Sequence, residues 1–123
     1  MRYMMFIKHK EDYRSIPAPA GLMEAMGTFI QDSFKNGTLV DTAGLKGTAD
    51  GAKVRLSSGK ISVTDGPFTE SKEIVGGYAL VEATSKEHAI DIAKQFMALH
   101  QKHWPAFDGE CEVRPLEDMS RPS

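Results

Sequence analysis

The residues of this sequence that could perform acid–base chemistry are its histidines and one short acidic segment. His9 follows an apolar run near the N-terminus, and His100 lies late in an amphipathic stretch of the C-terminal third. Between them, residues 65–73 contain three carboxylates. Because a carboxylate raises the pKa of a neighbouring imidazole and orients its ring, such a pair could move protons near neutral pH. The catalytic candidates are therefore His100, Asp65 and His9.

His100 shares the apolar stripe of its predicted helix, which places a polar ring on a face that packs inward. The commoner role of such a histidine is structural, with one ring N–H donated to a backbone carbonyl, and the alternative role is in a site. His103 follows at i, i+3, a spacing that would let both rings face one metal ion. No cysteine or carboxylate stands at a fixed ligand spacing from them, so we predict no metal site. The structural and site interpretations of His100 both stay open.

The segment Asp65-Gly66-Pro67-Phe68 also admits two interpretations. In the first it is a turn, in which Gly66 takes a special backbone conformation and Pro67 restricts φ. In the second the loop lines a pocket, with Phe68 as an apolar wall and the carboxylates accepting protons or hydrogen bonds. The turn is the commoner use of these residue types. The pocket candidates of the whole sequence are Asp65, Phe68, Glu70, Glu73, Tyr78, His100, His103 and Trp104.

Composition restricts the classes of function. A chain of 123 residues fits one domain, which we place at residues 1–116, followed by a flexible tail at 117–123. The net charge of -2 leaves no basic stripe for a phosphate backbone, so we expect no nucleic-acid partner. The single cysteine, Cys111, cannot form an intrachain disulfide, which favours a cytoplasmic location. The N-terminal apolar run is too short to span a membrane, so no membrane partner is expected.

No organic cofactor is predicted either. Gly76-Gly77 lacks the spaced glycines of a dinucleotide-binding loop, and the glycines at 47 and 51 do not form a phosphate loop. We interpret Trp104 as the edge of a core or a dimer contact, and Cys111 as a small strand residue.

Hydrophobic periodicity predicts the elements that position these residues. An apolar run at 3–7 indicates a central strand covered on both faces. Thr84 and Glu87 fit a capping box that begins the second helix, which ends near Trp104. The other elements expected are a helix from about 21 to 36, a strand at 38–43, a hairpin at 53–63, a strand at 78–81 after a segment without regular period at 65–77, and a last strand around 111–113.

Four motifs in this order resemble one family. They are Arg2-Tyr3-Met4-Met5, the run from Val63 to Glu73 around Asp-Gly-Pro-Phe, Gly76-Gly77-Tyr78, and Glu112-Val113-Arg114-Pro115. The chain resembles the DGPF branch of the YCII-related proteins over nearly its whole length. The resemblance implies a ferredoxin-like α+β fold, an antiparallel βαββαβ sheet with two helices on one face, here with an inserted hairpin. It also implies a homodimer formed through the sheet as a dimeric α+β barrel.

The resemblance implies an undefined biochemical role for most members. We therefore expect a small-molecule-binding or regulatory dimer with an unknown ligand. Some genes of this branch are associated with extracytoplasmic-function sigma factors, which implies a link to such a factor. The alternative is a cofactor-independent enzyme of lyase or hydrolase type that uses a His–carboxylate pair. In the expected fold, His9, residues 65–73 and residues 100–104 would converge at one edge of the sheet.

Overall fold

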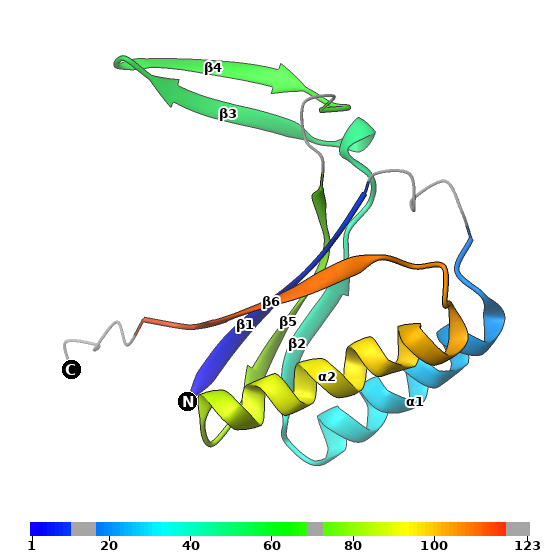
Figure 1. Ribbon diagram of the computed structural model, residues 1–123. Coiled ribbons are helices and arrows are strands. Elements are labelled where there is room, and N and C mark those ends of the chain that lie inside the picture. The colour runs from blue at the N-terminus through cyan, green and yellow to red at the C-terminus, as the bar shows by residue number, and fades with distance from the viewer. Residues whose placement is uncertain (11–16, 69–72, 118–123) are drawn as a thin grey trace.

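A computed structural model describes residues 1–10, 17–68 and 73–117 of the chain. Its elements follow the predicted order of strand, helix, strand, hairpin, strand, helix and strand (Figure 1). The strands are β1 (Arg2–His9), β2 (Leu39–Gly44), β3 (Ala52–Ser57), β4 (Lys60–Asp65), β5 (Ile74–Glu82) and β6 (Gly109–Pro115); the helices are α1 (Ala20–Lys35), α2 (Lys86–His103) and a 3₁₀ turn, η2 (Thr48–Asp50). The predicted tail at 117–123 lies outside the described residues apart from Glu117.

Four strands form one antiparallel sheet in the order β2-β5-β1-β6. β1 pairs with β5 on one side and with β6 on the other, and β2 pairs with the far edge of β5. This is the ferredoxin-like α+β arrangement, as predicted. The predicted central position of the first strand is confirmed, and its apolar residues on both faces suit that position because a central strand is covered more fully than an edge strand.

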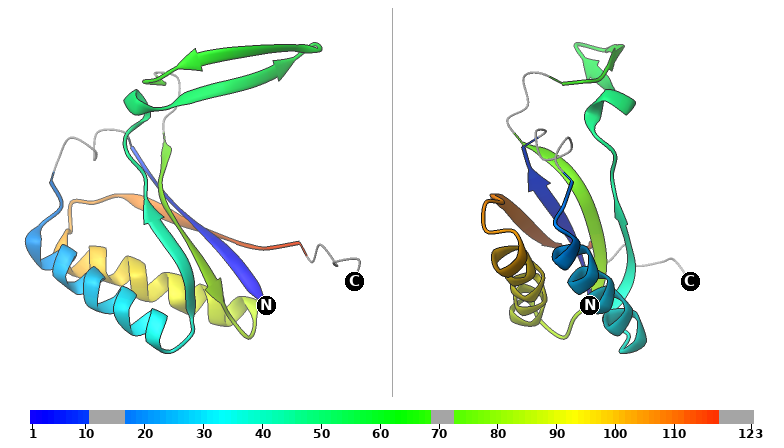
Figure 2. Two further views of the ribbon diagram at one scale, coloured as in Figure 1. Left: turned by 180° about the vertical axis from the view of Figure 1, so that it is seen from behind. Right: turned by 90° about the vertical axis from the view of Figure 1, so that its right-hand side faces the viewer.

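Both helices cover the same face of the sheet (Figures 1 and 2). Successive side chains along a strand point to opposite faces of the sheet, and the buried residues Tyr3, Met5 and Val81 point to the inner face, toward the helices. On α2, the buried positions recur at helical spacing, which supplies the apolar stripe that meets the sheet. The buried core consists of Tyr3, Met5, Leu39, Val81, Ala83, Ala89, Ile92 and Ala93.

The opposite face of the sheet, which we call the outer face, has no helix over it. Met4 lies opposite Leu80 and Phe6 opposite Tyr78, and all four side chains are half-buried in the isolated chain. Charged pairs border them: the Lys8 ammonium contacts Glu112, whose carboxyl pKa it lowers. The outer face is thus an apolar centre between charged edges.

Two predicted boundaries are wrong. The N-cap of α2 is Ser85, whose hydroxyl accepts a hydrogen bond from the His88 N–H at 3.0 Å, while the Thr84 N–H donates to Nδ1 of His88 at 3.0 Å. The imidazole of His88 thus accepts the hydrogen bond of the Thr84 backbone N–H, and the helix begins one residue later than the capping box predicted. β5 begins at Ile74 rather than near Tyr78, because an irregularity in its pairing with β1 interrupts the alternation that a regular strand would show.

The hairpin prediction is confirmed, and β3 and β4 form a two-stranded sheet of their own. The segment Asp65–Phe68 lies at its base. There the Gly66 N–H donates to the Gly51 carbonyl at 2.9 Å, and the Phe68 N–H donates to the Thr48 hydroxyl at 3.2 Å. The peptide bond between Gly66 and Pro67 is cis. These contacts favour the turn interpretation of the segment, since they tie the hairpin to η2.

Candidate functional site

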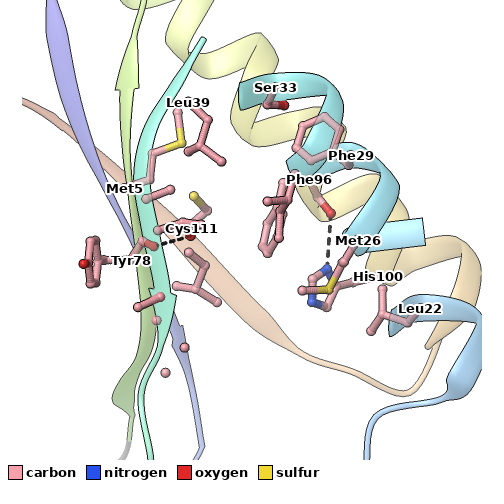
Figure 3. A pocket seen from close by; sticks show the side chains of 18 of the residues that line it. Met5, Leu22, Met26, Phe29, Ser33, Leu39, Tyr78, Phe96, His100 and Cys111 are labelled. Atoms are coloured by element: carbon pink, nitrogen blue, oxygen red, sulfur yellow. Dashed lines mark hydrogen bonds between the residues drawn. The ribbon is translucent and has the colours of Figure 1, made fainter. Parts of the chain in front are cut away.

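A cavity of about 600 Å³ lies between the helices and the inner face of the sheet. Side chains of α1 and α2 form one wall, and those of the strands form the other (Figure 3). Its size is within the usual range of small-molecule sites. Met5, Leu39, Val81 and Ile92 belong both to the core and to the cavity lining, so the cavity is continuous with the core.

The wall of this cavity is predominantly apolar. From α1 come Leu22, Met26 and Phe29, which repeat at helical spacing, and Met5 and Leu39 face them from the strands (Figure 3). Methionine side chains adapt to ligands of irregular shape because they are unbranched and polarizable. Among the described residues, no aspartate, glutamate, lysine or arginine lines the cavity. The site therefore suits an uncharged ligand with a large apolar surface.

His100 is a buried polar group of the helix wall, with 8% of its surface exposed, and Ser33 of α1 is another. Its Nδ1 lies 3.2 Å from the carbonyl of Phe96, one turn earlier in α2. A carbonyl can only accept, so Nδ1 carries the proton and Nε2 of the neutral ring holds a lone pair. No partner for Nε2 is found within residues 1–10, 17–68 and 73–117.

The pKa of His100 is lowered by burial and, more weakly, by the charge of His9; the Phe96 carbonyl acts in the opposite sense. This contradicts the prediction that a carboxylate raises it. The physical reason is that desolvation disfavours the charged imidazolium, and no acidic side chain of the described wall compensates. At neutral pH the ring is thus a neutral hydrogen-bond acceptor at the cavity wall, and the contact with the Phe96 carbonyl agrees with the structural interpretation.

His9 reaches the same cavity from the end of β1 and is 6% exposed. Its Nδ1 donates to the Lys10 carbonyl at 2.7 Å. The Phe107 ring lies between the two histidines, with its centroid 6.0 Å from that of His9 and 4.8 Å from that of His100. The Trp104 ring is the fourth member of the group, and its centroid lies 5.2 Å from that of Phe107. Two imidazoles and two aromatic rings thus form one end of the cavity.

Phe107 can lie there because of Gly109. A Cβ on Gly109 would stand 2.5 Å from the Phe107 ring and 2.8 Å from the Lys8 carbonyl. The absence of a side chain at this position lets the ring fold against the start of β6. Sequence reasoning missed Phe107, although an aromatic residue in a loop beside a predicted helix end is a signal that could have drawn attention to it.

Cys111 lines the cavity from β6, and burial raises the pKa of its thiol to about 11. The thiol therefore stays protonated at neutral pH and contributes a small polarizable surface rather than a nucleophile. This accords with its interpretation as a small strand residue. Sequence reasoning did not place Cys111, Met26 or Phe29 at a site, because a strand or helix stripe does not reveal whether it meets a core or a cavity.

The structure brings together only some of the predicted site residues. His9, His100 and Trp104 meet at the cavity. Tyr78 lines it through its backbone, whereas its ring points away from the helices and its hydroxyl donates to Asp41 at 2.9 Å (Figure 3).

The other pocket candidates are not among the cavity's lining residues. Asp65 and Phe68 belong to the hairpin base, where the Lys53 ammonium lies 4.4 Å from the centroid of the Phe68 ring. His103 lines a shallow hollow between the two helices. Glu73 precedes β5 and is exposed, and Glu70 lies outside the described residues. The structure therefore brings His9, His100 and Trp104 together at the cavity, but not Asp65 or His103.

Comparisons with known proteins are consistent with the motif resemblance. A family model described as YCII-related domain matches residues 1–119. An uncharacterized protein of Rhizobium meliloti (strain 1021) is 36% identical over 80 residues, which cover 65% of this chain and 60% of that protein. The chain thus matches about three fifths of the length of this curated relative. In the described part of the chain, neither α-helix has the length and apolar composition needed to cross a lipid bilayer.

Proposed function

The chain belongs to the YCII-related domain family, and we propose that it binds a small, uncharged, largely apolar molecule that donates a hydrogen bond to His100. The observation that carries the proposal is the buried Nε2 lone pair of His100 at the wall of a 600 Å³ apolar cavity. A buried acceptor without a partner costs free energy, and a ligand hydroxyl or N–H would supply the missing hydrogen bond.

The rest of the wall supports the same ligand class. An apolar wall contributes affinity through area removed from water, and a single oriented polar group contributes specificity. The aromatic rings of Phe96 and Phe107, whose centroids lie 4.9 and 4.8 Å from that of His100, would flank an aromatic ligand held there. A phenol-like molecule satisfies both requirements.

The test uses a matched pair of probes, 1-naphthol and naphthalene, which differ by one hydroxyl. Trp104 is the sole tryptophan of the chain and lines the cavity, so its fluorescence reports binding. We expect naphthol to bind more tightly than naphthalene by about 2- to 12-fold, the range of one net hydrogen bond. In His100→Leu the two probes should bind equally.

His103→Leu is the matched control, because His103 lies on the same helix but outside the cavity. It should keep the preference for naphthol. Ala79→Phe, which adds a ring to the inner face of β5, should block both probes. If neither probe changes Trp104 fluorescence, or if both probes bind Ala79→Phe as tightly as the wild type, the cavity is not a ligand site. If naphthol keeps its advantage in His100→Leu, His100 is not the acceptor.

Two further parts of the proposal concern assembly and chemistry. The apolar centre of the outer face supports a homodimer formed sheet to sheet, with each copy covering the other. The alternative of a His–carboxylate enzyme lacks its carboxylate among the described residues of the cavity, so no specific observation favours it.

A further inference from the structure

The hairpin formed by β3 and β4 has one apolar face that no described element covers. Val54 pairs with Val63 and Leu56 with Ile61, so alternation places these four side chains on the same face of the ribbon. They are 71%, 66%, 72% and 73% exposed, respectively. Four such side chains in one patch are unusual for a surface facing only water.

The ribbon also lacks the support that two strands need. An isolated two-stranded hairpin is marginally stable in water unless it packs on something else. Within the described residues, β3 and β4 pair only with each other, and the hairpin is joined to the body at its base. Its length and regular register favour a supporting surface, and residues 1–10, 17–68 and 73–117 supply none.

The base of the hairpin sets its direction. The Gly66 N–H bonds to Gly51, and the approach is so close that a Cβ on Gly66 would lie 1.6 Å from the Thr48 carbonyl oxygen. Held in this way, the hairpin extends away from the helices, over the side of the sheet that they leave uncovered (Figures 1 and 2). The hairpin and the outer face thus lie on the same side of the molecule.

Charge favours a second copy of this chain as the occupant. From Ala52 to Asp65 the hairpin carries Lys53, Arg55 and Lys60 against one acidic residue, Asp65, at the end of β4. The hairpin thus carries +2 and the chain as a whole has a net charge of -2, so the remaining residues carry -4. A basic arm is attracted to an acidic body, and a two-fold axis lets each arm reach the body of the other copy.

We propose that the hairpin is a dimerisation arm that packs its face of Val54, Leu56, Ile61 and Val63 on a second copy of the chain. This inference rests on the proposed sheet-to-sheet dimer and adds to it a contact that the sheet alone does not make. The Asp-Gly-Pro-Phe segment then acts in assembly, by aiming the arm, rather than in ligand binding.

The experiment measures the dimer dissociation constant by sedimentation velocity for three variants. Leu56→Ser with Ile61→Ser removes the apolar face of the arm, and we expect it to weaken the dimer at least tenfold. Arg55→Lys with Ser62→Thr alters the opposite face of the same strands and should leave the constant unchanged. Leu80→Glu, on the outer face, should abolish the dimer. Circular dichroism verifies that each variant is folded.

The outcomes separate the arm from the proposals on which it rests. If the Leu56→Ser, Ile61→Ser variant keeps the wild-type dimer dissociation constant while Leu80→Glu is monomeric, the sheet-to-sheet dimer is supported and the proposed role of the arm is wrong. A monomeric wild type at tens of micromolar would overturn both. Binding of a short DNA duplex that the arm substitutions abolish, without self-association, would assign the arm to nucleic acid instead. Naphthol binding, measured in parallel, tests the cavity independently of the dimer.

Discussion

Replacing Gly66 by alanine should detach the hairpin from the body while leaving the four-stranded sheet folded. The added Cβ would stand 1.6 Å from the Thr48 carbonyl oxygen and 2.5 Å from its carbon. Both are backbone atoms, so no side-chain rotation relieves the overlap. Ordinary contact begins at 3.4 Å, and reaching it requires the backbone of the hairpin base to move away from η2.

That movement breaks two hydrogen bonds, from the Gly66 N–H to the Gly51 carbonyl and from the Phe68 N–H to the Thr48 hydroxyl. Each contributes about 0.5–1.5 kcal/mol, so the attached arm loses about 1–3 kcal/mol relative to the detached arm. The equilibrium constant between the attached and the detached arm therefore shifts toward the detached arm by a factor of about 5 to 150. The core of the sheet does not include the hairpin and should keep its stability.

Hydrogen exchange followed by mass spectrometry measures this directly. Amides of β3 and β4 should lose protection in Gly66→Ala, while those of β1 and β5 keep theirs. Gly51→Ala is the control, since its Cβ would lie at an ordinary 3.6 Å from the same Thr48 oxygen and its backbone is extended. Equal protection of the hairpin in wild type, Gly51→Ala and Gly66→Ala would refute the account of the base.

Three further predictions concern stability. Ser85→Ala should lower the free energy of unfolding by about 1 kcal/mol through loss of the N-cap of α2, and Thr84→Ala should lower it less; the reverse order in urea titrations would restore the capping-box interpretation. Gly27→Ala should raise the free energy of unfolding by about 0.5–1 kcal/mol, and with it the melting temperature, because the added Cβ meets nothing within 4 Å in α1. An unchanged melting temperature would indicate local strain. Stability should fall as the pH drops below about 6.5, since the unfolded chain binds a proton at His100 that the native state, with its lowered pKa, resists. His100→Phe should reduce that fall, and an identical pH profile for the variant and wild type would show that His100 does not cause it.

The fold could be predicted from the sequence because its signals are local or repeat at a regular spacing. The apolar stripes of α1 and α2, the run in β1 and the alternation in β3 and β4 each follow from the geometry of one element. The motifs around Asp65–Phe68 and Glu112–Pro115 then indicated the family. The boundaries at Thr84 and Tyr78 were wrong, because Ser85 rather than Thr84 caps α2 and because the pairing of β5 with β1 is irregular.

The site could be predicted only in part. The burial of His100 follows from its place on the helical wheel, and the structure confirms that burial. Its chemical state does not follow, because the direction of a pKa shift depends on which groups the fold brings nearby. Asp65 was paired with His100 on the assumption that loops at one sheet edge converge, but the hairpin carries Asp65 away from the cavity.

By itself, the sequence determined the element order, the fold class, the family and the inward position of one histidine, since each depends on the spacing of residue types along the chain. Only the tertiary structure decided that the helices and the sheet enclose a cavity rather than a closed core. It also decided that His9, His100, Phe107 and Trp104 meet at one end of that cavity and that the hairpin stands apart from it. The physical reason is that the spacing of apolar residues along one element identifies the face that each side chain occupies. The distance between two packed layers depends instead on all the side chains between them at once.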